Sequence, residues 1–155
     1  MTFVASALDL SAFARLAARD HGWCVVSTTR SDGTVQSSLV TAGVLAHPVA
    51  DGGGEVVGFV AREGTRKLAN LRRRPALTAV AHAGHEWIAV EGTVDLVGPD
   101  DPWPGVDAER LRGLLREVFA AAGGTHDDWD EFDRVMRDER RAAVLLNPTR
   151  VYTNG

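Results

Sequence analysis

The sequence is poor in cysteine. Cys24 is the one thiol in the 155-residue chain, so the chain cannot form an internal disulfide. A single cysteine fits a reducing compartment, and the opening stretch MTFVASALDL lacks the apolar run of a secretory signal. We therefore expect a cytoplasmic protein. Because Cys24 stands within an apolar stretch, we interpret it as a small core residue rather than a reactive thiol.

Long hydrophobic runs and excess positive charge are missing as well. No segment approaches the roughly 18–20 apolar residues of a membrane span, so we expect no association with a membrane. The 17 Lys and Arg residues stand against 21 Asp and Glu residues, which gives a net charge of −4 at pH 7. Domains that bind nucleic acid are usually strongly basic, so this balance argues against a nucleic-acid partner.

The common catalytic signatures are absent too. The chain has no GxSxG, no GxGxxG after a predicted strand and no Walker A segment. His82 and His85 flank a predicted turn without a third metal ligand nearby, which argues against zinc. The acidic segment HDDWDEF (126–132) suits the first turn of a helix better than a cation site. The sequence therefore predicts no metal site and no catalytic nucleophile.

What the sequence does contain is a series of short β-strand patterns separated by turn signals. Its length and its hydrophobic content of 45% predict a single domain over residues 1–155. Strands are expected at Trp23–Thr29, Val35–Leu45, Glu55–Ala61, Ala76–His82, Glu86–Val97 and, as one or two short strands, within 142–155. Helices are expected at Asp9–Asp20, between Thr65 and Pro75, at Asp107–Ala122 and at Asp128–Arg141. Because alternating βα units are absent, these elements predict a mainly β, antiparallel barrel with peripheral helices.

The short helix that begins after Thr65 has an unusual first turn. Arg66 and Lys67 lie at the end of the helix that already carries partial positive charge, where a cation costs about 0.3–1 kcal/mol. The free amides of a first turn bind anions. Two readings stay open, a bound phosphate or carboxylate and simple tolerance at the surface. The run 72–74 is at the opposite end, where cations are favourable, and we interpret it as a solvated helix end.

The order of several motifs along the chain carries a family resemblance. They are DGTVQSSLV (32–40), RKLANLRRRP (66–75), VEGTVDLV (90–97), HDDWDEF (126–132) and NPTRVY (147–152). In this order they resemble the pyridoxamine 5'-phosphate oxidase-like, FMN-binding split-barrel proteins, in particular the actinobacterial branch that uses the deazaflavin coenzyme F420. The resemblance runs from about Leu10 to Tyr152. It implies a six-stranded antiparallel split β-barrel and a homodimer with two cofactor sites at the interface.

The resemblance also implies where the cofactor lies. Its ring follows two strands, its phosphate meets the start of the short helix, and residues near the 83–85 turn reach the site of the other subunit. The implied cofactor-binding residues are Gln36, Ser37, Ser38, Leu39, Val40, Val60, Ala61, Arg62, Arg66, Lys67, Asn70, His85 and Trp87. No catalytic residue is identified, because the cofactor itself carries the hydride chemistry. His82, His85 and Arg62 are candidate proton donors by position alone.

Three functions follow from this resemblance. The first is a reductase that transfers hydride from reduced F420 to a small or medium-sized unsaturated organic substrate. The second is an FMN-binding oxidoreductase of the same fold, and the third is a non-enzymatic protein that only binds the flavin or deazaflavin. Val35 stands where family members often carry proline before the glutamine of the second strand, which leaves the cofactor open.

Overall fold

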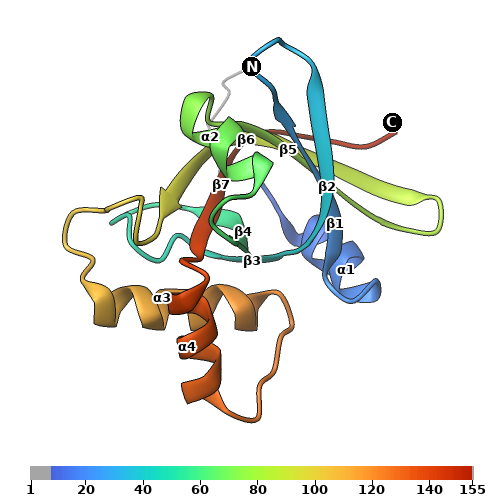
Figure 1. Ribbon diagram of the computed structural model, residues 1–155. Helices are drawn as coiled ribbons and strands as arrows, with labels where there is room; N and C mark the ends of the chain where they lie inside the picture. Colours follow the sequence, from blue (N-terminus) through green and yellow to red (C-terminus); the bar gives the residue numbers. More distant parts are fainter. Residues whose placement is uncertain (1–7, 155) are drawn as a thin grey trace.

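The computed structural model describes residues 8–154, and within them the protein is mainly β, as predicted. Seven strands form one antiparallel sheet: β1 (Trp23–Thr29), β2 (Val35–Thr41), β3 (Gly43–Ala46), β4 (Glu55–Ala61), β5 (Ala76–Ala83), β6 (Glu86–Val97) and β7 (Ala142–Tyr152). The helices in this range are α1 (Ser11–Arg19), α2 (Arg66–Arg73), α3 (Ala108–Ala121) and α4 (Trp129–Asp138). Figure 1 shows α3 and α4 together at one end of the molecule, on the far side of the sheet from α2.

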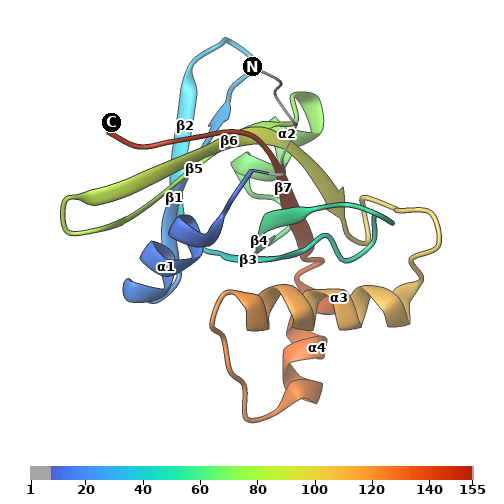
Figure 2. The same cartoon turned by 180° about the vertical axis from the view of Figure 1, so that it is seen from behind.

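The sheet corrects the predicted six-stranded barrel. Its strand order is β2-β1-β5-β6-β7-β4-β3, and within residues 8–154 no hydrogen-bonded pairing closes it. The predicted strand Val35–Leu45 is interrupted at Ala42, after which the chain turns to pair with β4 instead of β1. The reason is packing by α3, because a Cβ on Gly43 would lie 2.0 Å from the Ala121 carbonyl oxygen. The two edges of the open sheet are therefore consecutive in the chain (Figure 2).

The core has two parts, one on each face of the central strands. The larger part packs α1 and α2 against the inner face of the sheet around Phe13, Phe59 and Leu68. The smaller part packs α3 and α4 against the opposite face of β4 and β7 around Leu114 and Leu145. Strands that are buried on both faces carry continuous apolar runs, which explains the sequences of β4 and β7. No helix within residues 8–154 is long and apolar enough to cross a membrane.

The starts of α2, α3 and α4 differ in whether a side chain caps the free amides. Asp107 accepts a hydrogen bond from the Arg110 amide at 2.8 Å. Asp128 accepts from the amides of Asp130 and Glu131 in the first turn of α4, so this acidic segment does begin a helix, as predicted. Thr65 occupies the N-cap position of α2, but its hydroxyl donates to the Arg62 carbonyl at 2.9 Å and caps no amide. The first turn of α2 therefore has two cations and no side-chain cap.

Candidate functional site

A cleft of about 450 Å³ opens where the sheet meets the pair α3–α4. Its walls come from β2, the end of β4, the start of α2 and the second half of α3, and α4 closes one side. Most of the wall is apolar. The lining side chains are Trp23, Leu39, Val40, Thr41, Val60, Ala61, Arg62, Thr65, Lys67, Val118, Phe119, Ala122, Phe132, Met136 and Arg141.

Three cations stand together in this cleft. Burial, followed by the positive charges of Arg141 and Arg62, lowers the pKa of the Lys67 amine below its usual 10.5. Arg141 donates to Glu139 at 2.8 Å. Within residues 8–154, by contrast, no carboxylate lies within ion-pair distance of Arg62 or Lys67. The cleft therefore holds positive charge that the described chain leaves uncompensated, which is the condition for binding an anion.

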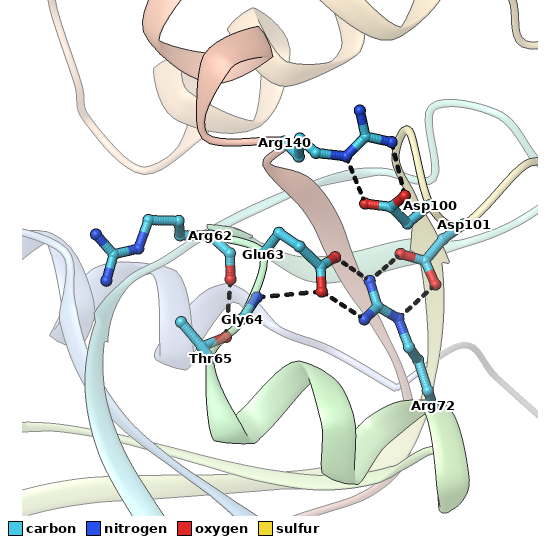
Figure 3. A network of polar contacts seen from close by, with 8 residues as sticks. All are labelled: Arg62, Glu63, Gly64, Thr65, Arg72, Asp100, Asp101 and Arg140. Atoms are coloured by element: carbon cyan, nitrogen blue, oxygen red, sulfur yellow. Dashed lines mark hydrogen bonds and ion pairs between the residues drawn. The ribbon is translucent and has the colours of Figure 1, made fainter.

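A network of ion pairs fixes the loop 62–65, which carries Arg62 and leads into α2 (Figure 3). Arg72, on the last turn of α2, donates to Glu63 at 2.9 and 2.6 Å and to Asp101 at 2.9 and 2.7 Å. Glu63 also accepts from the Gly64 amide at 3.1 Å. Figure 3 shows the Arg62 side chain pointing away from this network. The network ties the loop 62–65 to the last turn of α2 and to Asp101, and because this loop leads into α2 it positions the start of the helix.

Arg72 is thus not the solvated helix-end cation that the sequence predicted. Its hydrogen bonds to Glu63 and Asp101 raise the pKa of its guanidinium above the usual value. The same contact holds the pKa of the Glu63 carboxyl below its usual 4.5. Arg73 is also engaged, since it donates to the Thr29 carbonyl at 2.6 Å. Both side chains attach the helix to neighbouring elements instead of facing solvent alone.

The structure brings six of the predicted cofactor-binding residues into the cleft and places the others elsewhere. Those in the cleft are Leu39, Val40, Val60, Ala61, Arg62 and Lys67. Ser37 lies on the outer face of β2, where its hydroxyl is 2.8 Å from that of Ser27. Ser38 lies on the inner face, and its oxygen is buried without a hydrogen-bond partner among the described residues.

A buried chain of hydrogen bonds holds two more of the predicted residues. The Asn70 amide donates to the Thr28 hydroxyl at 3.0 Å, and that hydroxyl donates to the Gln36 side-chain oxygen at 3.2 Å. Asn70 and Thr28 are each 2% exposed. This chain fastens α2 to β1 and β2, so these polar groups serve the packing of the helix in the described structure.

Arg66 and Lys67 are adjacent in sequence but face different hollows. Lys67 lies in the cleft, whereas Arg66 lines a separate hollow of about 270 Å³ with Arg30, Arg73 and Asn70. Successive residues of an α-helix point about 100° apart, which accounts for the separation. The two cations of the first turn therefore do not lie around a common cavity.

The β5–β6 hairpin holds the remaining predicted residues. His85 is exposed in the turn, and Trp87 packs edge-on against Tyr152 with ring centroids 6.2 Å apart. The nearby His82 is exposed, and its Nδ1 is 3.4 Å from the Gly84 carbonyl oxygen. None of these side chains lines the cleft of its own chain.

Several side chains of the cleft were not predicted from the sequence. Arg141 follows α4, and Phe119, Phe132 and Met136 come from the helical pair. Their local patterns are those of ordinary amphipathic helices, so no local signal assigns them to a site. Only the placement of α3 and α4 beside β2 brings them there.

Two predictions about reactive and metal-binding side chains can be compared with the structure. Cys24 is a core residue, as predicted, and burial raises the pKa of its thiol to about 12. Within residues 8–154 no group of three or more His, Cys, Asp or Glu side chains gathers to hold a metal ion. In the acidic segment, His126 accepts from the Asp128 amide at 3.0 Å and Asp133, just beyond it, pairs with Arg116 at 2.9 Å.

Comparison with known proteins gives the class of fold. No protein-family model matches the chain. Among solved structures, an F420 reductase is 17% identical, with a TM-score of 0.58 over 84% of this chain and 88% of its own. A conserved hypothetical protein from Mycobacterium tuberculosis is 18% identical, with a TM-score of 0.63 over 97% of this chain and 88% of its own.

A pyridoxamine 5'-phosphate oxidase-related, FMN-binding protein from Nostoc punctiforme is similar in the same way. It is 13% identical, with a TM-score of 0.58 over 97% of this chain and 84% of its own. The chain thus shares its fold with solved structures that include an F420 reductase and a pyridoxamine 5'-phosphate oxidase-related, FMN-binding protein. This confirms the predicted resemblance at the level of fold.

Proposed function

We propose that the protein binds a flavin or deazaflavin in the cleft and works as an oxidoreductase. The observation that carries this proposal is the uncompensated positive charge of Arg62 and Lys67 at one side of an otherwise apolar cleft. A cofactor of this kind joins a flat ring to an anionic tail. The apolar wall of the cleft suits the ring, and Arg62 and Lys67 suit the tail. Similarity in fold to a protein named as an F420 reductase supports the deazaflavin F420 as the first choice.

Each group of the cleft has a task in this proposal. Lys67 and Arg62 hold the anionic end, and each charge-assisted hydrogen bond contributes about 1.5–3 kcal/mol. Ser38 does not line the cleft, but its buried hydroxyl has no partner in residues 8–154, and it precedes the cleft residues Leu39 and Val40 on β2. Phe119 and Met136 exclude water from the opposite side. The bound cofactor supplies hydride transfer to an unsaturated organic substrate.

A homodimer belongs to the same proposal. The outer face of β1 and β2 exposes apolar side chains next to the cleft, among them Val25, Val35 and Leu39. Covering this face with a second copy removes apolar surface from water. His85 and Trp87 then reach the site of the other subunit. A cytoplasmic location is part of the proposal, supported by the free, buried Cys24.

Binding of the cofactor to the purified protein tests the proposal directly. We expect F420 to bind the unmodified chain in a fluorescence titration and to bind Lys67→Ala at least tenfold more weakly. Arg74→Ala is the matched control, because Arg74 lies at the other end of α2 and outside the cleft. Equal affinity of the unmodified chain and Lys67→Ala would show that the anion site is misplaced.

The same titration with FMN separates the candidate cofactors. Tight binding of FMN without binding of F420 favours the FMN-binding oxidoreductase, a function that the FMN-binding relative of this fold also supports. Binding of neither cofactor rejects the proposal. Turnover of reduced F420 against a panel of enones then distinguishes an enzyme from a protein that only binds its cofactor.

A further inference from the structure

A second cavity, of about 780 Å³, lies beside the cleft and is not used by the proposed function. The loop after β6, the first half of α3 and the second half of α4 surround it. It is larger than the cleft, and its volume falls within the range of small-molecule sites. Met136 and Arg141 line both cavities.

The floor of the second cavity is apolar. Trp103, Val106, Leu111 and Met136 converge on it from the loop and both helices, and each remains only partly buried. Their exposed parts face one shared space instead of scattered points on the surface. Such a floor fits a rigid, ring-bearing body of moderate size.

The rim carries two arginines that are only loosely paired. Arg112 has a side chain 54% exposed, and its nearest carboxylates, those of Asp133 and Glu109, are 3.8 and 3.9 Å away. Arg137 is 74% exposed and lies 3.6 Å from Asp138. These distances are long for ion pairs, so either guanidinium can turn toward another anion at small cost.

Most of the other charged side chains around the cavity are held by partners, and the exception is Glu109, whose side chain is 84% exposed and lies 3.9 Å from Arg112. Arg116 binds Asp133 at 2.9 Å, and Arg140 binds Asp100 at 2.9 and 2.6 Å. These pairs leave Glu109, Arg112 and Arg137 as the loosely held charges at the rim. The two arginines are the cations available to a ligand, and with the one carboxylate beside them they favour a single negative charge.

We propose that the second cavity binds a small organic monoanion with an aromatic body, of the class of aromatic carboxylates. The ring lies on Trp103, Leu111 and Met136, and the carboxylate meets Arg112 and Arg137 at the mouth. This site is separate from the cleft that holds Lys67. It assigns a ligand to the part of the helical pair that does not line the cleft.

Calorimetric titration of the full chain with 2-naphthoate tests this proposal. We expect one saturable site, weakened at least tenfold by Leu111→Trp, which fills the cavity. The double change Arg112→Gln with Arg137→Gln weakens binding about fivefold, and the neutral 2-naphthamide binds the unmodified chain more weakly by a similar factor. Arg134→Gln is the matched control, because Arg134 is an exposed arginine of α4 that does not line the cavity.

A second measurement keeps the test decisive if Leu111→Trp does not fold. 2-Naphthoate in contact with Trp103 quenches the fluorescence of the unmodified chain, and Trp103→Phe removes that part of the quenching. Absence of saturable binding overturns the proposal. So does unchanged affinity in a folded Leu111→Trp variant, or equal affinity for naphthamide and naphthoate. Loss of binding in Lys67→Ala also overturns it, because the ligand then occupies the cleft.

Discussion

Lys67 is the one lysine in the chain, since the other 16 cationic residues of this kind are arginines. The structure places the side-chain amine of Lys67 in the cleft, near the guanidinium groups of Arg62 and Arg141. An ammonium ion in such surroundings loses hydration and gains repulsion, so the pKa of the amine is lowered from its usual 10.5. Lys67 is therefore both a binding group for anions and a chemical reporter of whether the cleft is filled.

Reductive methylation is expected to measure the reactivity of the Lys67 amine. Lys67 should react half-maximally at a pH below 10.5, because its pKa is lowered mainly by burial and then by Arg141 and Arg62. Arg141→Gln removes one repelling charge and moves the half-point to higher pH, whereas Arg74→Gln leaves it in place. Mass spectrometry of the digested protein measures the reaction at this position. We expect FMN or F420 bound in the cleft to slow the methylation of Lys67. Equal methylation rates with and without saturating cofactor would argue against the cleft as the cofactor site.

Cys24 gives a prediction of the opposite kind. Its thiol is 2% exposed and has a pKa raised to about 12, so the nucleophilic thiolate is scarce and out of reach at pH 8. We expect no reaction of the native protein with Ellman's reagent at that pH, and one equivalent of thiol in denaturant. Rapid reaction of the native protein would place Cys24 at the surface.

At the scale of elements, the start of α2 depends on its far end. Arg72 links Glu63 before the helix to Asp101 in another loop, and so the short helix is held at both ends. Such a link is needed because an eight-residue helix with two cations in its first turn and no side-chain cap is weak by itself.

Removal of this link is expected to destabilise the protein measurably. Arg72→Met keeps the aliphatic stem but leaves two carboxylates without their partner, which lowers the free energy of unfolding by about 1–3 kcal/mol. Arg74→Met, at the end of the same helix, is the control and changes it little. Urea unfolding at pH 7 measures both variants.

The pH dependence of this effect has a defined sign. The Glu63 carboxyl has a lowered pKa in the folded state because of Arg72. Its contribution to stability is therefore complete above about pH 4.5, the usual value, and is lost as the pH falls through the folded-state pKa. We expect the difference between the unmodified chain and Arg72→Met to shrink below pH 4.5. A constant difference down to pH 3 would contradict the assigned role of Glu63.

The elements were predicted well where local pattern decides them. The bounds of β1, β4 and β6 agree with the prediction, because β-branched runs and turn residues mark both ends. The interruption at Ala42 was not predicted, although Gly43 stands inside the predicted strand, where a glycine often marks a bend or a close backbone approach. In the structure α3 makes that close approach to Gly43.

In the candidate site, too, local sequence predicted some of the residues, and others depend on how distant elements pack. Lys67 was predicted to bind an anion and lines the cleft, whereas Arg66, grouped with it because the two are neighbours in sequence, lines a separate hollow. Adjacent residues on a helix do not face each other, which the helical geometry alone implies. Arg141 was missed because its position beside Lys67 exists only after α4 has packed against the sheet.

At the scale of the whole molecule, the open sheet exposes an apolar surface. Val35 and Leu39 on β2 are 62% and 61% exposed, and Val25 and Trp23 on β1 lie on the same outer face. A contiguous patch of this kind marks an interaction surface more often than a solvated one.

This surface leads us to expect a particle of twice the 16.6 kDa chain in sedimentation equilibrium. Val25→Lys places a charge at the centre of the face and shifts the protein toward the monomer. Val135→Lys is the matched control, because Val135 is an exposed valine on α4, away from β1. A monomer in the unmodified chain, or a dimer that survives Val25→Lys unchanged, would rule out this face as the interface.

The shared lining of the two cavities has a thermodynamic consequence. Met136 and Arg141 contribute to both, so an occupant of either cavity acts on the same side chains. Any resulting coupling free energy is reciprocal: the factor by which 2-naphthoate changes the affinity for F420 equals the factor by which F420 changes the affinity for 2-naphthoate. We expect that factor to move toward one when Met136→Ala shortens the common wall. The helix α4, which covers part of the core, would thereby also couple the binding of two ligands.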